Sequence, residues 1–328
     1  MKENGKIWLM ALVMGVVLPA LFFAVAEKVV KRPSVMQSVE QTDNQADRTE
    51  SALFHTGIAV PVLHENRYEQ MELNTYLTCV LLGEMPTEFD SEALKAQAVV
   101  ARTYTLKRNT TGLKHQGGAV CTDATCCQAY CTMEDFLQSG GSQEALDKVK
   151  RAVHATAQQV LTYQGALIEA TYFSCSGGKT EDALAVWGAE IPYLQSVDSP
   201  GEENAVHYTD QVTFSAKNFA SRLGFIPKTS PVAWLGQITY TQGGGIDTIV
   251  IDGNSYKGTE IRQKLGLRST AFTIQIIGDS VQITTRGFGH RVGMSQYGAE
   301  AMAVQGSTYP EILEHYYPGT ELVAYLQN

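Results

Sequence analysis

Basic residues are under-represented in this chain of 328 residues. It contains 25 Lys and Arg against 34 Asp and Glu, so its formal net charge is −9 at pH 7. Proteins that bind nucleic acid usually present a basic face, and this balance therefore argues against a nucleic-acid partner. The sequence also has no internal repeat of fixed period, which argues against a solenoid or a propeller. With 44 % apolar residues, the chain can form one large or two ordinary domains with hydrophobic cores.

Long apolar runs are equally scarce, and the one present lies at 7–26, where it is long enough to cross a bilayer as a helix. Two lysines precede it, and an Ala-Val-Ala segment at its end fits a signal-peptidase cleavage pattern. The run exceeds the usual length of a cleaved signal, which favours a retained anchor over a removed one. We therefore expect residues 1–32 to form an N-terminal transmembrane anchor. The polar segment 33–56 is predicted to be a flexible linker.

A carboxylate, Glu84, stands at the end of an apolar segment that begins near Leu73. Pro86 disfavours helical conformation in the residue before it, so a helix is expected to end near Glu84. Asp90 can cap a second helix, which then runs without Gly or Pro to Leu106. The sequence therefore predicts a carboxylate at a helix end, followed by a short loop and a second helix.

Two cations, Lys95 and Arg102, lie two turns apart on one face of this second helix. A carboxylate at a helix end beside a helix that carries two cations is a workable acid–base site. The alternative is that Glu84 is only a solvated helix terminus, which is the ordinary position for a charged residue.

A cluster of cysteines follows the second helix. It comprises Cys121, Cys126, Cys127 and Cys131, with His115 ahead of them. Tetrahedral zinc takes thiolates and imidazoles, and a structural site needs four such ligands. The spacing is not a paired C-x2-C arrangement, and an exported protein can also use its cysteines for disulfides. Both interpretations remain open on the spacing alone.

The segment from Ser174 to Gly178 reads Ser-Cys-Ser-Gly-Gly. The hydroxyls of Ser174 and Ser176, followed by two glycines, allow backbone and hydroxyl groups to approach a ligand closely. Trp187 and Tyr193 could supply the flat apolar faces that sugar rings prefer. The alternative is a tight turn with Trp187 in the core.

Polar groups also crowd a predicted helix start near the C-terminus, at Ser295, Gln296 and Tyr297, where they suit the binding of sugar hydroxyls. A cysteine–histidine hydrolase built from Cys175 and His290 is a weaker alternative.

The pattern changes between these motifs, because residues 206–285 are rich in Thr and alternate polar with apolar side chains. We read this part as a β-rich second lobe. The predicted fold class is α+β, a two-lobed mixed helix and sheet body preceded by one transmembrane helix. Residues 57–205 and 286–328 would form a catalytic lobe that includes the cysteine-rich loop.

Three long motifs of this chain, in this order, resemble the sporulation stage II protein D family. They lie at 82–108, 170–200 and 287–322, and their sequences are LGEMPTEFDSEALKAQAVVARTYTLKR, ATYFSCSGGKTEDALAVWGAEIPYLQSVDSP and GFGHRVGMSQYGAEAMAVQGSTYPEILEHYYPGTEL. Members of that family are membrane-anchored lytic transglycosylases that cut peptidoglycan glycan strands while the mother cell engulfs the forespore. The resemblance therefore implies an enzyme of the cell wall.

By this resemblance Glu84 would protonate the leaving glycosidic oxygen. It would then take the proton from the muramic acid's own 6-hydroxyl as that oxygen attacks C1, which gives a 1,6-anhydro end. One carboxylate suffices because the nucleophile belongs to the substrate. The residues expected to bind the strand are Lys95, Arg102, Ser174, Ser176, Gln296 and Tyr297.

Other functions remain open on the sequence alone. A hydrolase would need a second carboxylate, for which Glu88, Asp90, Glu92 and Asp182 are candidates. A wall-binding module would leave Glu84 inert. A zinc hydrolase is disfavoured, because four protein ligands leave no open position for water.

The resemblance also implies a metal, partners and a location. Some members hold zinc, and position by position the quartet in this chain would be His115, Cys121, Cys126 and Cys127, with Cys126 in place of a histidine and Cys131 as a rival. Stage II sporulation proteins P and M are expected partners. The expected location is the mother cell's engulfing membrane, crossed once, with the catalytic body on the extracytoplasmic side. Arg291 stands where the family usually has Gly, so it either strains the backbone or adds a cation for an acidic substrate.

Overall fold

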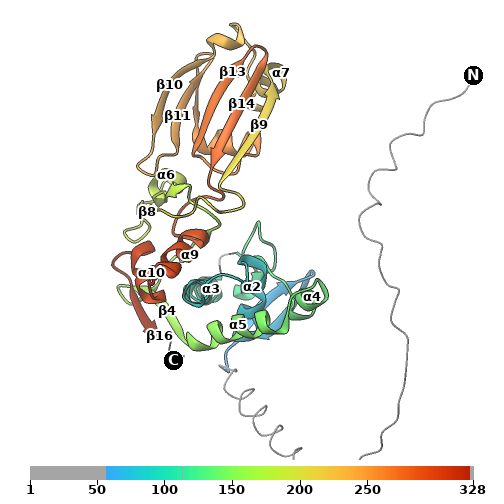
Figure 1. The fold of residues 1–328 in the computed structure, drawn as a ribbon, viewed down its shortest axis with the longest axis vertical. Helices are drawn as coiled ribbons and strands as arrows, with labels where there is room; N and C mark the ends of the chain where they lie inside the picture. The colour runs from blue at the N-terminus through green and yellow to red at the C-terminus, as the bar shows by residue number, and fades with distance from the viewer. Residues whose placement is uncertain (1–56, 113, 326–328) are drawn as a thin grey trace, which may run out of the picture. The chain divides into compact units, whose positions relative to one another are not determined.

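The computed structural model describes residues 57–112 and 114–325, all of which belong to one compact unit that spans residues 49–328. This part of the chain is a mixed α+β structure with several small sheets (Figure 1). The predicted anchor at 1–32 and linker at 33–56 lie outside the described residues. Within the described ranges, none of the helices combines the length and the apolar character that a bilayer span requires.

Helices and short strands alternate along the chain from β1 to β16. In chain order they are β1 (Ala59–His64), β2 (Arg67–Glu72), α2 (Leu73–Glu84), α3 (Ser91–Thr111), η1 (Gln116–Gly118), β3 (Val120–Cys121), α4 (Met133–Gln138), α5 (Gln143–Ala155), β4 (Gln159–Tyr163), β5 (Ala166–Leu167), β6 (Tyr172–Phe173), β7 (Gly178–Lys179), α6 (Ala183–Trp187), β8 (Asp198–Ser199), β9 (Thr209–Ser215), α7 (Ala216–Leu223), η2 (Pro231–Ala233), β10 (Leu235–Tyr240), β11 (Ile246–Ile251), β12 (Asn254–Lys257), α8 (Gly258–Leu265), β13 (Phe272–Ile277), β14 (Ser280–Arg286), β15 (Met294–Ser295), α9 (Gln296–Val304), α10 (Tyr309–Tyr316) and β16 (Glu321–Ala324).

Helix α3 is the central element of the first part of the structure and is seen end-on in Figure 1. It packs against α2, α5, α9 and α10. Asp90 caps its start by accepting a hydrogen bond from the Glu92 amide at 2.8 Å, and Gly112 ends it in the left-handed conformation at φ 63°. Helix α2 ends at Glu84, and Met85 after it is extended. Both helix boundaries predicted from the sequence are confirmed.

The buried hydrophobic residues form two clusters. The first draws on β1, α2, α3, α5 and β4, and also on α9 and α10 near the C-terminus. The second is built by α7, β11, α8, β13 and β14. The chain therefore leaves the first cluster after Leu194, builds the second, and returns to the first at Val292.

Two short parallel pairings bring the distant motifs together. Strand β15 pairs with β6, with Met294 opposite Tyr172 and Ser295 opposite Phe173. Strand β3 pairs with β1, which places Cys121 opposite Leu63. The end of α2, the cysteine-rich loop, β6 and the start of α9 consequently converge around the Glu84 side chain.

Candidate active site and metal cluster

The Glu84 carboxylate lies among three hydrogen-bond donors. Its Oε1 accepts from the backbone amide of Ala129 at 2.6 Å and from the Tyr172 hydroxyl at 3.0 Å. Its Oε2 accepts from the Gln296 side-chain amide at 3.4 Å. These donors come from the cysteine-rich loop, β6 and α9, so the site is assembled from three separate parts of the sequence.

Burial raises the pKa of Glu84 above the ordinary value of a glutamate, while hydrogen bonds from Ala129, Tyr172 and Gln296 act in the opposite direction. The side chain remains half-buried rather than sealed in the core. A carboxyl group of this kind can hold a proton nearer to neutral pH and still reach a substrate, which is what a general acid requires.

A second layer of polar groups stands behind the carboxylate. The Gln128 amide Nε2 donates to the Tyr172 hydroxyl at 3.1 Å. The Gln128 Oε1 accepts from the Tyr76 hydroxyl at 3.2 Å and lies 2.9 Å from the Thr105 hydroxyl. Gln128 is fully buried, so its amide position is fixed by these contacts. Tyr172 and Gln128 were missed as site residues in the sequence, because only the fold places them beside Glu84.

Removing the Tyr172 hydroxyl should change the acidity of Glu84. In Tyr172→Phe the carboxylate loses a donor that lowers its pKa. We therefore expect the alkaline limb of the pH–rate profile to move up by about one unit, since Glu84 keeps its proton to higher pH. Activity measured across pH for both proteins tests this.

Tyr317→Phe is the matched control for that variant. The Tyr317 hydroxyl is also buried and donates to the Thr171 carbonyl at 2.6 Å, one residue from Tyr172, and it accepts from the Met294 amide at 3.3 Å. Its loss should lower stability without moving the pH profile. Equal shifts in the two variants would contradict a direct effect of Tyr172 on Glu84.

Gly83 allows the cysteine-rich loop to approach the end of α2. A Cβ atom at this position would lie 2.6 Å from the Tyr130 amide nitrogen and 2.9 Å from the Ala129 carbonyl carbon. Both are backbone atoms, so the loop would have to move, and the Ala129–Glu84 hydrogen bond would move with it.

We expect Gly83→Ala to lower the free energy of unfolding by about 1–3 kcal/mol and to reduce activity per folded molecule. Denaturant unfolding together with activity assays measures both. Gly112→Ala is the control, because its Cβ would meet open space and only the left-handed backbone would be strained. It should lose stability but keep the activity of its folded fraction.

Of the predicted substrate-binding residues, the structure brings Gln296 into contact with Glu84 and places Tyr297 and Ser174 next to it. The Tyr297 amide donates to the Ser174 carbonyl at 3.0 Å. The half-buried Tyr297 ring meets Phe89, from the loop after Glu84, edge-on at a centroid distance of 5.0 Å. These residues form the wall of the site on the α9 side.

The structure does not bring Arg102 into the site. Its side chain is fully buried, and the guanidinium donates to the Val153 carbonyl in the last turn of α5 at 3.0 Å and to the Gln159 carbonyl at the start of β4 at 3.3 Å. Its assignment to substrate binding is corrected, because a guanidinium enclosed in this way ties elements together. Lys95 instead forms an ion pair with Glu92 at 2.6 Å.

Ser176 and Tyr193 are also core groups, contrary to their predicted contact with sugars. Ser176 is fully buried, and its hydroxyl donates to Glu202 Oε2 at 2.9 Å. The Tyr193 side chain is buried, and its hydroxyl accepts from the Glu169 amide at 3.0 Å. Glu202 was missed in the sequence, although this buried carboxylate shapes the Ser-Cys-Ser-Gly-Gly turn by accepting from two of its amides. Trp187, by contrast, is 45 % exposed.

Three of the four candidate second carboxylates have structural roles. Asp90 and Asp182 cap helices α3 and α6, and Glu92 accepts from the Tyr309 amide at 2.8 Å besides pairing with Lys95. Glu88 is exposed. Capping and pairing account for Asp90, Asp182 and Glu92 without a part in catalysis.

Glu300 is a carboxylate that the sequence analysis did not single out. It lies one helical turn beyond Gln296 on α9 and accepts from the Asp90 amide at 2.6 Å. Burial raises its pKa, as does the nearby negative charge of Asp90. The hydrogen bond from the Asp90 amide to Glu300 holds the loop that follows Glu84 against α9.

The cysteine–histidine alternative is not supported by the geometry. Burial, with the charge of Glu202, raises the pKa of Cys175 to about 12, so the thiol is protonated at neutral pH. The His290 Nδ1 accepts from the Val292 amide at 3.1 Å, and its ring lies between Phe173 and Trp187.

A second site lies in the loop between α3 and α4. One ligand atom each from His115, Cys121, Cys126 and Cys127 lies within 4.8 Å of all the others. The Cys126 Sγ is 3.4 Å from the His115 Nε2 and 4.0 Å from the Cys127 Sγ. Three thiols and one imidazole at these separations fit a tetrahedral zinc ion. This is the quartet predicted from the sequence.

The metal cluster and Glu84 are directly connected through the backbone. Cys127 is followed at once by Gln128 and Ala129, the residues that contact Tyr172 and Glu84. A turn in which the amides of Cys126 and Cys127 both donate to the Asp123 carbonyl at 2.9 Å orients this segment. Whatever fixes the cysteine loop therefore also fixes two of the groups around Glu84.

Comparison with known proteins agrees with the resemblance of the motifs. The model of a family described as stage II sporulation protein matches residues 64–163. The chain is 40 % identical over 289 residues to the stage II sporulation protein D of Bacillus amyloliquefaciens, covering 86 % of this chain and 83 % of that protein. The chain belongs to the stage II sporulation protein D family.

Two further relatives come from Bacillus subtilis strain 168. Its stage II sporulation protein D is 38 % identical over 284 residues, which cover 84 % of this chain and 82 % of that protein. An amidase enhancer is 28 % identical over 304 residues, which cover 75 % of this chain and 40 % of that protein. Membership of the family makes this a sporulation protein related to the cell wall.

Proposed function

We propose that this protein is a lytic transglycosylase that cleaves the MurNAc–GlcNAc bond of peptidoglycan glycan strands during engulfment of the forespore. The observation that carries the proposal is the environment of Glu84. One half-buried carboxyl group, with its pKa raised by burial, faces three donors that hold it in place. The four carboxylates considered for a two-carboxylate hydrolase are exposed, paired or used as helix caps.

The chemistry needs two proton transfers, one from Glu84 and one back to it. Protonated Glu84 donates to the glycosidic oxygen as the bond to the muramic acid C1 breaks. The resulting carboxylate then takes the proton of the C6 hydroxyl as that oxygen bonds to C1. Glu84 ends in its starting state, and the released strand carries a 1,6-anhydro end. Ala129, Tyr172 and Gln296 stabilise the carboxylate between the two steps.

Substrate contacts are proposed for those neighbours of this centre that solvent can reach. Tyr297 and Ser174 lie next to Gln296, and Trp187 presents a half-exposed ring beside His290 at a centroid distance of 5.4 Å. Burial lowers the pKa of His290 to about 4, so its imidazole is neutral at physiological pH. The flat face of the Trp187 ring suits the apolar side of a sugar ring.

Product analysis tests the proposal. Purified protein is incubated with glycan strands whose stem peptides have been removed, and the products are identified by mass spectrometry. We expect ends lighter by one water than the hydrolysis product, without a reducing sugar. Reducing ends would indicate a hydrolase, and unchanged strands that bind the protein would indicate a wall-binding module.

We propose a structural zinc ion at His115, Cys121, Cys126 and Cys127. When bound, it would supply charge neutralisation for the thiolates and hold the loop that carries Gln128 and Ala129. Four protein ligands leave it no open coordination position, so it takes no part in the proton transfers.

We further propose that residues 1–32 anchor the protein in the mother cell's engulfing membrane, with the body on the extracytoplasmic side. Stage II sporulation proteins P and M are the proposed partners. The apolar run at 7–26 and the family membership support this arrangement. Protease digestion of intact protoplasts should remove the body of the protein. If the body is digested only after the protoplasts are lysed, it lies in the cytoplasm and the proposed orientation is wrong.

A further inference from the structure

A fully buried ion pair joins two segments that lead to the Glu84 site. The Arg291 Nη1 lies 3.1 Å from the Glu181 Oε1, and their side chains are 2 % and 1 % exposed. Arg291 also donates to the carbonyls of Ser176 at 2.7 Å, Lys179 at 2.6 Å and Gly243 at 2.7 Å. The φ of Arg291 is 68°, so its backbone is left-handed, as the first of its two predicted roles requires. Its cation is paired inside the protein and is not offered to a substrate, as the second role would require.

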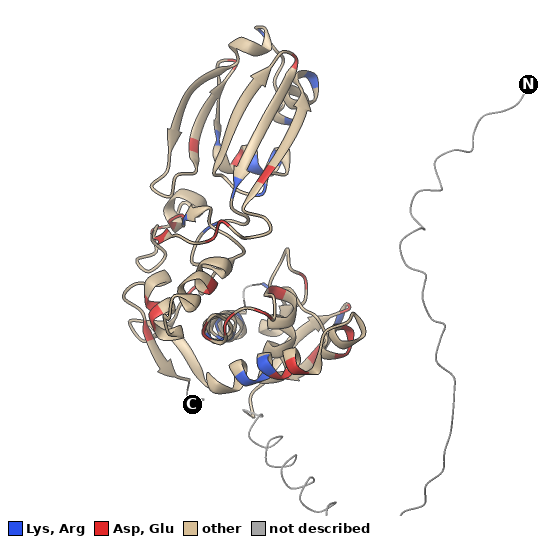
Figure 2. Ribbon diagram, in the orientation of Figure 1, with Lys and Arg blue, Asp and Glu red and all other residues tan. Residues whose placement is uncertain are grey.

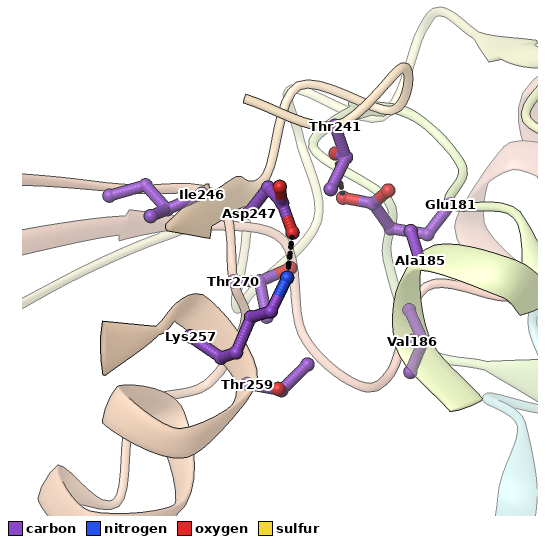
Figure 3. A pocket seen from close by; sticks show the side chains of 9 residues that line it. All are labelled: Glu181, Ala185, Val186, Thr241, Ile246, Asp247, Lys257, Thr259 and Thr270. Atoms are coloured by element: carbon purple, nitrogen blue, oxygen red, sulfur yellow. Dashed lines mark hydrogen bonds and ion pairs between the residues drawn. The ribbon is translucent and has the colours of Figure 1, made fainter. Parts of the chain in front are cut away.

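A loop next to the second hydrophobic cluster closes around the same pair. The Glu181 Oε1 accepts from the Thr241 hydroxyl at 2.9 Å and the Gly245 amide at 3.0 Å. Figure 3 shows Thr241 hydrogen-bonded to Glu181 among the residues that line a small pocket. A Cβ atom at Gly245 would lie 2.2 Å from the Glu181 Oε1, and one at Gly243 would lie 2.3 Å from the Thr180 carbonyl oxygen. The loop therefore fits only with glycine at these positions.

The two segments that the ion pair joins are those that carry the side-chain donors of Glu84. Tyr172 lies nine residues before Glu181, and Gln296 lies five residues after Arg291. Strands β6 and β15 hold these segments parallel, and the Glu181 amide donates to the Arg291 carbonyl at 2.6 Å. The segments around Tyr172 and Gln296 are thus joined twice, by the β6–β15 strand pairing next to Glu84 and by the Glu181–Arg291 ion pair.

We infer that Arg291 and Glu181 are positioning residues that hold Tyr172 and Gln296 in contact with Glu84, and that this geometry depends on the loop 241–245. The inference rests on the proposed function for its effect on activity, but its structural part does not. Replacing both charges of a buried pair together is often neutral for folding, so the effect of this pair on geometry can be tested separately from its effect on stability.

The first experiment separates positioning from folding. Glu181→Gln alone leaves Arg291 buried without a counter-charge and should lower the thermal midpoint. The double variant Glu181→Gln/Arg291→Met removes both charges and should recover only part of that midpoint, because the carbonyls of Ser176, Lys179 and Gly243 lose their donor. Its kcat should stay lower by roughly tenfold at nearly unchanged KM. Recovery of kcat together with stability would overturn the inference and leave a purely structural pair.

Gly245→Ala tests the dependence on the loop without altering either charge. We expect kcat to fall as in the double variant. The control is Asp247→Asn, which breaks the exposed ion pair with Lys257 on the other side of the same pocket (Figure 3). It should leave kcat and stability unchanged. Full activity in Gly245→Ala, or an equal loss in Asp247→Asn, would contradict a role for the loop.

Hydrogen exchange provides a readout that does not require activity. The amides of Cys175, Met294 and Tyr297 donate to Phe288, Thr171 and Ser174 across the two segments. In the double variant these amides should exchange at least about tenfold faster, while α3 keeps its protection. Unchanged exchange would overturn the inference even if the proposed reaction is correct, and faster exchange in a protein without transglycosylase activity would contradict the proposed function alone.

Discussion

Glu84→Gln should abolish strand cleavage while leaving the fold and glycan binding nearly intact. Gln has the shape of the protonated carboxyl group but cannot give up a proton as an acid or take one as a base. Loss of a general acid alone costs about 10² to 10⁴ in rate, and the loss in this variant should reach the upper end because one group serves both steps. The measurement is anhydro-product release by mass spectrometry, with thermal unfolding as a check of the fold.

Glu300→Gln is the matched control for that variant. Glu300 is another partly buried carboxyl group with a raised pKa near the loop, and it touches the Asp90 amide instead of Glu84. Its replacement should change activity by less than about fivefold, since an amide can also accept that hydrogen bond. Unchanged turnover in Glu84→Gln together with a large loss in Glu300→Gln would move the chemistry to the second carboxylate.

Removing one ligand of the metal cluster should have the second large effect. We expect Cys127→Ser to lose zinc and about 2–4 kcal/mol of stability, or about 5–15 °C in thermal midpoint. Activity per folded molecule should also fall, because the released segment begins with Gln128 and Ala129, which contact Tyr172 and Glu84. Elemental analysis, thermal unfolding and activity are measured on the same preparations in reducing buffer.

Cys131→Ser is the control within the same loop. The Cys131 thiol donates to the Thr132 carbonyl at 3.5 Å and stands outside the four clustered ligands. Its replacement should keep the zinc and most of the stability. Wild-type protein with less than about a tenth of an equivalent of zinc after metal-supplemented expression would refute the site. Zinc lost from Cys131→Ser would reassign the quartet.

The helices around Glu84 could be predicted because their signals are local. Pro86 ends α2 and Asp90 starts α3, and each acts within a few residues of its own position. The mixed α+β fold followed from the same kind of reading. The burial of Arg102 could not be predicted in this way. Periodicity separates the faces of a helix, but α3 is enclosed by four other helices and has buried residues all round, so no face of its middle turns is free.

The surroundings of Glu84 were less accessible to sequence reasoning. Gln296 was singled out because it stands at a helix start among polar neighbours. Tyr172 and Gln128 have no such local signal: Tyr172 contacts Glu84 across 88 positions of the chain, and Gln128 contacts Tyr172 across 44. The four proposed metal ligands, in contrast, lie within 13 positions, and their chemistry alone indicated a cluster. Features that depend on residues close together in the sequence could be predicted, whereas contacts that depend on strand pairing could not.

Acidic and basic residues are interspersed along the described elements (Figure 2). One cation, Lys148 on α5, holds the loop after Glu84 in shape. Its ammonium group donates to the carbonyls of Thr87 at 3.1 Å, Glu88 at 3.2 Å and Phe89 at 2.5 Å.

The hydrogen-bond chain behind Glu84 has a fixed direction. The Tyr76 hydroxyl donates to the Gln128 carbonyl oxygen, so the amide must present its N–H group to Tyr172. Tyr172 then has one lone pair occupied and its single proton aimed at Glu84. Burial raises the pKa of Tyr172 well above its ordinary value, so that proton is retained. Among the described residues, the three hydrogen-bond partners of Glu84 therefore all offer a hydrogen and none accepts one. In the proposed reaction, the acceptor of the Glu84 proton is then the substrate oxygen rather than one of these partners.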